Sequence, residues 1–294
     1  MLTSRPSRPG RKPGNAPRRK SRATVAVLLA AVLAVSGYLV VRTLGPALVG
    51  AGCRAVGRHQ SVLLDTEQAN IAATIAAVAH KQSMPHAAVD IAYATALQES
   101  KLHNLPYGDM DSVGVFQQRP SQGWGPRKDL LDPVYATTKF FRALAAVPRY
   151  RQMPVYKAAQ AVQRSADGSA YSQYEPMAAQ MTPAFTGVRA HSVYCWSSSS
   201  PAHAADLRAA TRELTHAFGP VGASQANVAG SRALLLRVGT GAAGWAVAAW
   251  LVTHAAGYDI HQVRYAGYQW RASAGQRGWA HNAGEPPTGH IELS

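Results

Sequence analysis

Residues 94–100 have the sequence Ala-Thr-Ala-Leu-Gln-Glu-Ser, and residues 114–117 have the sequence Gly-Val-Phe-Gln. The first stretch ends an alanine-rich helix that is predicted to begin near Pro85, with an apolar stripe leading to Glu99. A carboxyl group at this end of a helix meets the negative end of the helix macrodipole, and burial in the stripe also disfavours its charge. Glu99 is therefore predicted to act as a general acid, which is the first requirement for cleaving a glycosidic bond.

The basic charge of the chain is concentrated at its N-terminus. The 294 residues include 30 Lys and Arg against 15 Asp and Glu, a formal net charge of +15. Residues 1–22 contain eight of these bases and no acid, so they supply +8 and the rest supplies +7. The remainder would favour an acidic polymer, such as a cell wall with anionic polymers, and no nucleic-acid partner is expected. A basic tail that binds nucleic acid is an alternative, to be tested by salt-dependent DNA retention.

Residues 23–42 are predicted to be a transmembrane anchor. Residues 23–41 are almost wholly apolar, which is long enough for a helix to cross the hydrocarbon core, and Arg42 follows them. Because the basic tail comes first, the positive-inside rule keeps the N-terminus in the cytoplasm and exports the bulk of the chain. The prediction is a single-pass protein of the plasma membrane. A cleaved signal peptide is the alternative.

Cys53 and Cys195 are the two cysteines of the chain, and both follow the predicted anchor. Export places them in an oxidising compartment, where a single pair is expected to form a disulfide. Two unpaired thiols are the alternative. Cys53 lacks a neighbouring set of Cys and His residues of the kind that holds zinc, so no metal site and no cofactor are predicted.

Periodicity and turn residues predict the elements of the exported part. Asp65, followed three positions later by Gln68, predicts the start of a helix. An apolar helix is predicted at about 242–256, and strands are predicted over 261–265, 268–273 and 290–293. A second membrane span over 238–253 is the alternative to the apolar helix, although this segment has only 16 residues.

These elements give a mainly α domain followed by a small α/β domain. The predicted segments are a basic cytoplasmic tail (1–22), an anchor (23–42), a stalk (43–59), the mainly α domain (60–196), a linker with one helix (197–231) and the small α/β domain (232–294).

Three motifs of the mainly α domain resemble those of the lysozyme-like superfamily, which includes soluble lytic transglycosylases and goose-type lysozymes. Gln-Glu-Ser (98–100), Gly-Val-Phe-Gln (114–117) and Ala-Ala-Gln-Ala-Val-Gln-Arg-Ser (158–165) occur in the order of that family's helix-terminal Glu-Ser, its Gly-Leu-Met-Gln-like turn and its Ala-Tyr-Asn-Ala-Gly-like helix. The resemblance covers about residues 60–190, and the longer sequence is similar to an uncharacterised actinobacterial branch. It implies an α+β lysozyme-like fold.

The resemblance also implies an activity, which is cleavage of the β-1,4 bond between N-acetylmuramic acid and N-acetylglucosamine in peptidoglycan. The enzyme would be a lytic transglycosylase or a muramidase, with Glu99 as the catalytic acid and Gln117 lining the cleft. Gln163 stands where the third motif has Asn, and Ser165 stands where it has Gly. These two departures support the alternative, a non-catalytic cell-wall-binding or scaffold protein that retains the groove.

Asp109 and Asp111 are candidates for a second catalytic carboxylate, since Gly108-Asp109 resembles a Gly-Asp segment of goose-type lysozymes. A carboxylate about 6.5–9.5 Å from Glu99 would activate water and invert the anomeric centre. Without one, the 6-hydroxyl or acetamido group of the substrate would complete the reaction, as in lytic transglycosylases. The alternative is that both Asp residues only form turns.

The remaining candidates are assigned to substrate binding. Trp124 would stack on a sugar ring or pack in the core, and Arg119 would bind a carboxylate of peptidoglycan or form a structural ion pair. The other candidates are Ser100, Gln118 and Tyr171. The predicted partners are peptidoglycan glycan strands, the plasma membrane and proteins of the cell wall, of division or of secretion.

Overall fold

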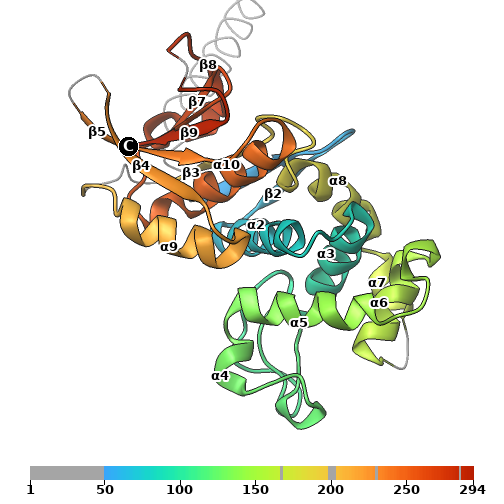
Figure 1. Ribbon diagram of the computed structural model, residues 1–294. Coiled ribbons are helices and arrows are strands. Elements are labelled where there is room, and N and C mark those ends of the chain that lie inside the picture. Colours follow the sequence, from blue (N-terminus) through green and yellow to red (C-terminus); the bar gives the residue numbers. More distant parts are fainter. Residues whose placement is uncertain (1–49, 166–167, 198–202, 229–230, 285) are drawn as a thin grey trace, which may run out of the picture. The chain divides into compact units, whose positions relative to one another are not determined.

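A computed structural model describes residues 50–165, 168–197, 203–228, 231–284 and 286–294 (Figure 1). The predicted tail and the predicted anchor at 23–42 lie outside these residues. Among the helices that the structure describes, none combines the length and the apolar composition that crossing a membrane requires. The described residues belong to one compact unit, which includes the described parts of the predicted linker, 197, 203–228 and 231.

The predicted fold class, a mainly α domain with a small α/β domain, is wrong. The protein is about 48% helical and 17% strand, and it contains two antiparallel sheets, so its class is mixed α/β. The smaller sheet has the order β2-β1-β3, and the larger has the order β4-β5-β9-β6-β7-β8. The smaller sheet escaped prediction because its strands are only four or five residues long, which is too short for a clear alternation of apolar and polar side chains.

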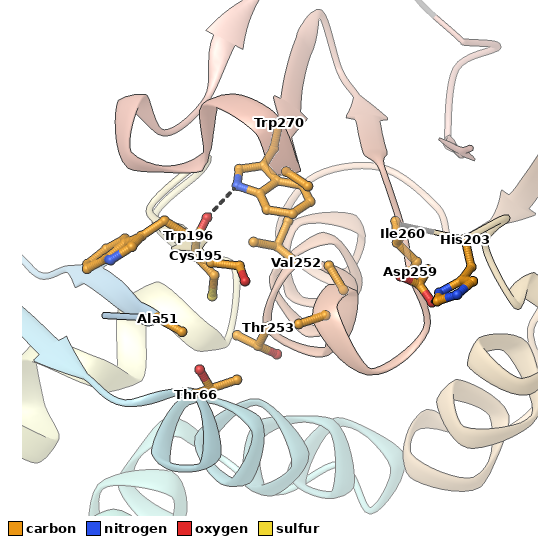
Figure 2. Close-up of a pocket in the computed structure, with 14 residues that line it drawn as sticks. Ala51, Thr66, Cys195, Trp196, His203, Val252, Thr253, Asp259, Ile260 and Trp270 are labelled. Carbon is orange, nitrogen blue, oxygen red and sulfur yellow. Dashed lines mark hydrogen bonds and ion pairs between the residues drawn. The ribbon is translucent and has the colours of Figure 1, made fainter. Parts of the chain in front are cut away.

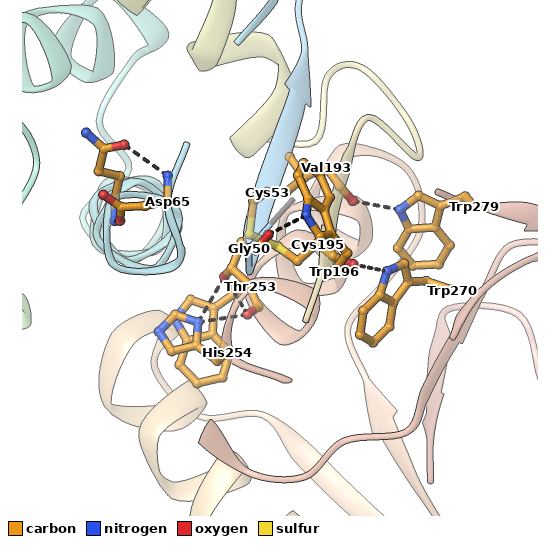
Figure 3. The surroundings of a disulfide bond; sticks show 12 residues. Gly50, Cys53, Asp65, Val193, Cys195, Trp196, Thr253, His254, Trp270 and Trp279 are labelled. Atoms are coloured by element: carbon orange, nitrogen blue, oxygen red, sulfur yellow. Dashed lines mark hydrogen bonds between the residues drawn. A yellow bond between two sulfur atoms is a disulfide. The ribbon is translucent and has the colours of Figure 1, made fainter. Parts of the chain in front are cut away.

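The smaller sheet joins the two ends of the helical region. It consists of β1 (Gly52–Val56), β2 (Ser61–Leu64) and β3 (Val193–Trp196). Cys53 of β1 lies directly opposite Cys195 of β3, and a disulfide joins them (Figure 3). Both cysteines are buried, so the bond lies in the core.

The helical region begins with α2 (Thr66–Lys81) and α3 (His86–Ser100). The backbone N–H of Gln68 donates to Asp65 Oδ1 at 2.9 Å, and the backbone N–H of Asp65 donates to Gln68 Oε1 at 3.0 Å, which is a complete capping box. The other helices are α4 (Arg127–Leu130), α5 (Pro133–Ala145), α6 (Val155–Gln163), α7 (Ser169–Ser172), α8 (Glu175–Phe185), α9 (Leu207–Phe218) and α10 (Ala242–His254). Short 3-10 helices are η1 (Pro120–Gln122), η2 (Tyr150–Gln152), η3 (Ala255–Gly257) and η4 (Ala272–Arg277).

The larger sheet follows α9 along the chain. Its strands are β4 (Gly222–Val228), β5 (Ser231–Arg237), β6 (Gln262–Tyr265), β7 (Tyr268–Arg271), β8 (Ala280–His281) and β9 (His290–Leu293). The indole N–H groups of Trp270 and Trp279 donate to the carbonyl oxygens of Cys195 and Val193, at 3.1 and 2.7 Å (Figure 3). Helix α10 packs on α2, α8 and β3, so the C-terminal segment shares its core with the helical region.

His254, at the end of α10, gives the protein a predictable acid sensitivity. Its ring stacks on Trp250 with centroids 3.8 Å apart, and its Nδ1 lies 2.8 Å from the carbonyl oxygen of Trp250. Burial lowers the pKa of His254 to about 4, against a smaller opposite effect of that carbonyl. The folded protein therefore keeps the imidazole neutral at a pH where the unfolded chain protonates it.

The free energy of unfolding is expected to fall as the pH drops from about 6.5 to about 4, by roughly 3 kcal/mol from this one group. Above pH 6.5 the imidazole is neutral in both states and contributes no pH dependence. Urea unfolding of the wild type and of His254→Gln, at pH 7.5 and at pH 4.5, measures the difference. The variant should lose less stability than the wild type over this interval. Equal losses in the two proteins would contradict the assignment.

Candidate functional site

Glu99 lies one residue before the end of α3, on a helix whose other residues from Ala88 onward are nearly all buried. The helix ends because Lys101 adopts the left-handed conformation, with φ of 56°. The Glu99 side chain is half-buried, and its Oε1 accepts a hydrogen bond of 2.7 Å from the hydroxyl of Tyr171. The carboxyl group is thus fixed by a neighbour from α7, 72 positions further along the chain.

Tyr171 is only 3% exposed, so its hydroxyl is a buried donor and faces Glu99 from inside the protein. Burial raises the pKa of the Tyr171 phenol, a hydrogen bond with Ser165 lowers it, and the neighbouring Glu99 raises it again. The phenol therefore keeps its proton and remains a donor. This contact uses Oε1 of Glu99 as the acceptor, which leaves Oε2 as the oxygen that can exchange a proton with a ligand.

The three motifs identified in the sequence meet beside Glu99. The hydroxyl of Ser100 donates to the carbonyl oxygen of Val115 at 2.7 Å, which ties the end of α3 to the Gly-Val-Phe-Gln turn. Gln163, the last residue of α6, donates from Nε2 to the carbonyl oxygen of Phe116 at 2.8 Å. Both acceptors are main-chain groups of the same turn. The turn therefore holds the first and third motifs together.

Gln117 braces the loop that precedes this turn. Its Nε2 donates to the carbonyl oxygens of Tyr107 and Gly114, at 3.3 and 3.1 Å, and the hydroxyl of Ser112 donates to its Oε1 at 3.1 Å. The residue has a positive φ of 47°, which turns its side chain back toward the loop. At Gly108, a Cβ atom would lie 1.8 Å from Gln117 Oε1, so a larger residue there would displace the Gln117 side chain.

Gln118, the second of two consecutive glutamines, occupies a different environment. It is 1% exposed, and its Nε2 donates to the carbonyl oxygen of Ala136 on α5 at 3.2 Å. The side chain therefore joins the turn to α5 and does not face a ligand. Trp124, the candidate for sugar stacking, is partly buried and packs against the hydrophobic core.

The two candidate aspartates are both part of the 109–121 loop. Asp111 accepts 2.9 Å bonds from Arg119 Nε and from the Ser121 hydroxyl, and a 2.7 Å bond from the Ser121 backbone N–H. The Arg119 contact, followed by the Ser121 backbone N–H, lowers the pKa of Asp111 to about 2, so the carboxylate is ionised at neutral pH. Asp109 is exposed, and its carbonyl oxygen accepts from Ser112 in a turn.

The structure thus brings together four of the predicted residues, Glu99, Ser100, Gln163 and Tyr171, with the turn that contains Gln117. Arg119 is engaged with Asp111 at a partly exposed ion pair. The carbonyl oxygens of Val115 and Phe116, which accept from Ser100 and Gln163, were not predicted from the sequence. Every residue has a main-chain carbonyl, so the residue type does not show which one will be used.

The arrangement fixes the carboxyl group of Glu99 between α3 and α7. Glu99 does not line any of three well-defined cavities among the described residues. Within residues 50–294, apart from the gaps given above, three or more His, Cys, Asp or Glu side chains nowhere gather as a metal site would require. No protein-family model matches the chain, and no curated protein matches it. The residues around Glu99 are therefore the basis for a function.

Proposed function

We propose that the protein cleaves the glycan strands of peptidoglycan at the β-1,4 bond between N-acetylmuramic acid and N-acetylglucosamine, with Glu99 as the general acid. The observation that carries this proposal is the fixed, half-buried carboxyl of Glu99, whose Oε1 accepts from the buried Tyr171 hydroxyl at 2.7 Å. The contacts of Ser100 and Gln163 with one turn support it, because they join the three motifs that resemble the lysozyme-like superfamily.

The proposed reaction begins with proton transfer from Glu99 Oε2 to the glycosidic oxygen. The bond between that oxygen and the anomeric carbon breaks, and positive charge develops on the sugar ring. The carboxylate of Glu99 then accepts a proton from the incoming hydroxyl, which is either the 6-hydroxyl of the same sugar or water. Attack by the 6-hydroxyl gives an anhydro sugar, and attack by water gives a reducing end.

The environment of Asp111 argues against this residue as the base that activates water. All the donors around Asp111 stabilise its ionised form in a loop, with Arg119 and Ser121 as partners. A carboxylate held in this way is a weak base, because its pKa is about 2. Asp109 stays the candidate for a base that activates water.

Gln163, which stands where the third motif has Asn, forms a hydrogen bond with the Gly-Val-Phe-Gln turn. Its amide donates to the carbonyl oxygen of Phe116, so the departure in residue type leaves a hydrogen bond to the turn in place. This contact is compatible with catalysis and with the alternative of a wall-binding protein without turnover, and the test below separates the two. The proposal includes an anchor at 23–42 that places the site outside the plasma membrane, where peptidoglycan and other wall proteins are the partners.

The test uses the purified full-length protein in detergent with purified sacculi. An enzyme is expected to release soluble glycan fragments and to reduce the turbidity of the suspension with time. Co-sedimentation in the same tubes measures binding. Binding without release of fragments would overturn the proposal and favour the wall-binding alternative.

Replacement of Tyr171 by phenylalanine is expected to lower the rate of release by roughly 10- to 100-fold. The hydroxyl stabilises the negative charge that Glu99 gains as it gives up its proton, and a hydrogen bond to a charged group contributes about 1.5–3 kcal/mol. The ring fills the same space, so only the hydroxyl is lost. Tyr174→Phe is the matched control, because the hydroxyl of Tyr174 contacts Lys101 and not Glu99. Equal rates for both variants would show that the Tyr171 hydroxyl does not position the acid.

A further inference from the structure

A cavity of about 250 Å³ lies apart from Glu99, where β1, β3, α10 and β7 come together (Figure 2). Its walls are mostly apolar and include Ala51, Val252, Ile260 and the indole ring of Trp270. Segments from both ends of the described chain form these walls. A ligand that displaces water from these apolar walls binds with a favourable free energy.

One end of the cavity carries a histidine and an aspartate. Figure 2 shows His203 and Asp259 side by side there, with Ala51 and Trp196 at the other end. His203 Nδ1 lies 3.7 Å from Asp259 Oδ2, which is longer than a hydrogen bond, and the side chains are 82% and 35% exposed. The carboxylate of Asp259 is therefore partly buried without a close cationic partner at this contact.

The backbone around this pair is fixed. The ring Nε2 of His261 lies 2.8 Å from the carbonyl oxygen of His203, and the backbone N–H of Asp206 donates to the carbonyl oxygen of Tyr258 at 2.9 Å. Asp259 adopts a left-handed conformation, with φ of 51°, which aspartate tolerates better than most residues. These contacts hold the backbone next to both members of the pair, and Asp259 lines the cavity.

We propose that this cavity binds a small molecule with a primary ammonium group on an apolar body. The ammonium would donate to Asp259, and the apolar body would lie against Val252 and Trp270. The volume suits about ten non-hydrogen atoms, since a cavity of about 150 Å³ holds benzene. An anionic ligand would meet the Asp259 charge, and a ligand without an amine would leave it unpaired. This site is independent of the proposed glycan cleavage.

Phenethylamine and 2-phenylethanol test the proposal, because they have the same size and differ in charge. Titration of the full-length protein, followed by tryptophan fluorescence and by calorimetry at low salt, should show at least tenfold tighter binding of the amine. Asp259→Asn is expected to reduce amine binding to the level of the alcohol, because asparagine tolerates the same backbone conformation. Asp129→Asn is the control and should keep the preference, because Asp129 is a half-buried residue of α4 that does not line the cavity.

Val252→Phe provides a second test, because the larger ring would fill the cavity and should weaken binding of both compounds. Circular dichroism shows whether this variant is folded. If it is not, the comparison of Asp259→Asn with Asp129→Asn decides alone. The proposal is overturned if neither compound binds, if both bind equally to the wild type, or if Asp259→Asn still prefers the amine.

Discussion

Replacement of both Cys53 and Cys195 by alanine is expected to lower the free energy of unfolding by about 5 kcal/mol. The disulfide joins residues 142 positions apart, so its loss releases more than half of the described chain from one long loop in the unfolded state. Alanine is chosen because both sulfur atoms are buried, and a serine hydroxyl would lack a partner there.

Guanidinium unfolding, monitored by circular dichroism and by tryptophan fluorescence, measures this loss. The two probes should report one transition in the wild type, because Trp270 and Trp279 bond to the strand that carries Cys195. Wild-type protein treated with a reductant should lose a similar amount of stability. A loss below about 1 kcal/mol in both experiments would contradict a stabilising role of the bond.

Replacement of Glu99 by glutamine is expected to lower the rate of glycan release about 1000-fold, within the range of 10²–10⁴ that general acid catalysis contributes. The amide oxygen can still accept from the Tyr171 hydroxyl, so the fold and sacculus binding should be retained. What is lost is the acidic proton, which an amide does not supply at neutral pH.

The control for this variant is Glu213→Gln, which changes the same group on the exposed face of α9. Its initial rate of release, measured as soluble fragments per minute, should equal that of the wild type. If Glu99→Gln retained more than a tenth of the wild-type rate, another group would have to be the acid. Asp109, which is exposed in the neighbouring loop, would then be the first to replace.

Local signals predicted the helices well, because each signal and its structure lie within a few residues. Asp65 and Gln68 form the capping box that their spacing predicts, and α3 begins directly after Pro85. In the C-terminal segment, β6, β7 and β9 lie where the predicted strands at 261–265, 268–273 and 290–293 lie. These strands could be predicted because their apolar and aromatic residues alternate between turns.

The smaller sheet could not be predicted because its pairing is not local. β1 pairs with β3 across most of the described chain, and nothing in a four-residue strand specifies such a distant partner. The β4–β5 hairpin begins inside the segment predicted as a linker, where Gly, Ser and Ala are typical of a loop. Together these strands change the fold class from mainly α to mixed α/β.

At the candidate site, too, local features could be predicted and contacts between distant residues could not. The predicted disulfide between the two cysteines is present, whereas the catalytic role of Glu99 stays a prediction. The environment of each side chain depended on tertiary structure, however. Gln117 and Gln118 are adjacent, yet one braces an exposed loop and the other is buried against α5, because the backbone reverses at the positive φ of Gln117. Sequence order alone cannot separate such neighbours.

The most direct test of Glu99 as the proton donor is mass spectrometry of fragments released from purified sacculi by wild-type protein and by Glu99→Gln at equal concentrations. The account predicts disaccharide-containing muropeptides from the wild type, with anhydro ends for a transglycosylase or reducing ends for a hydrolase, and only background from the variant. Equal release of muropeptides by the two proteins would contradict it.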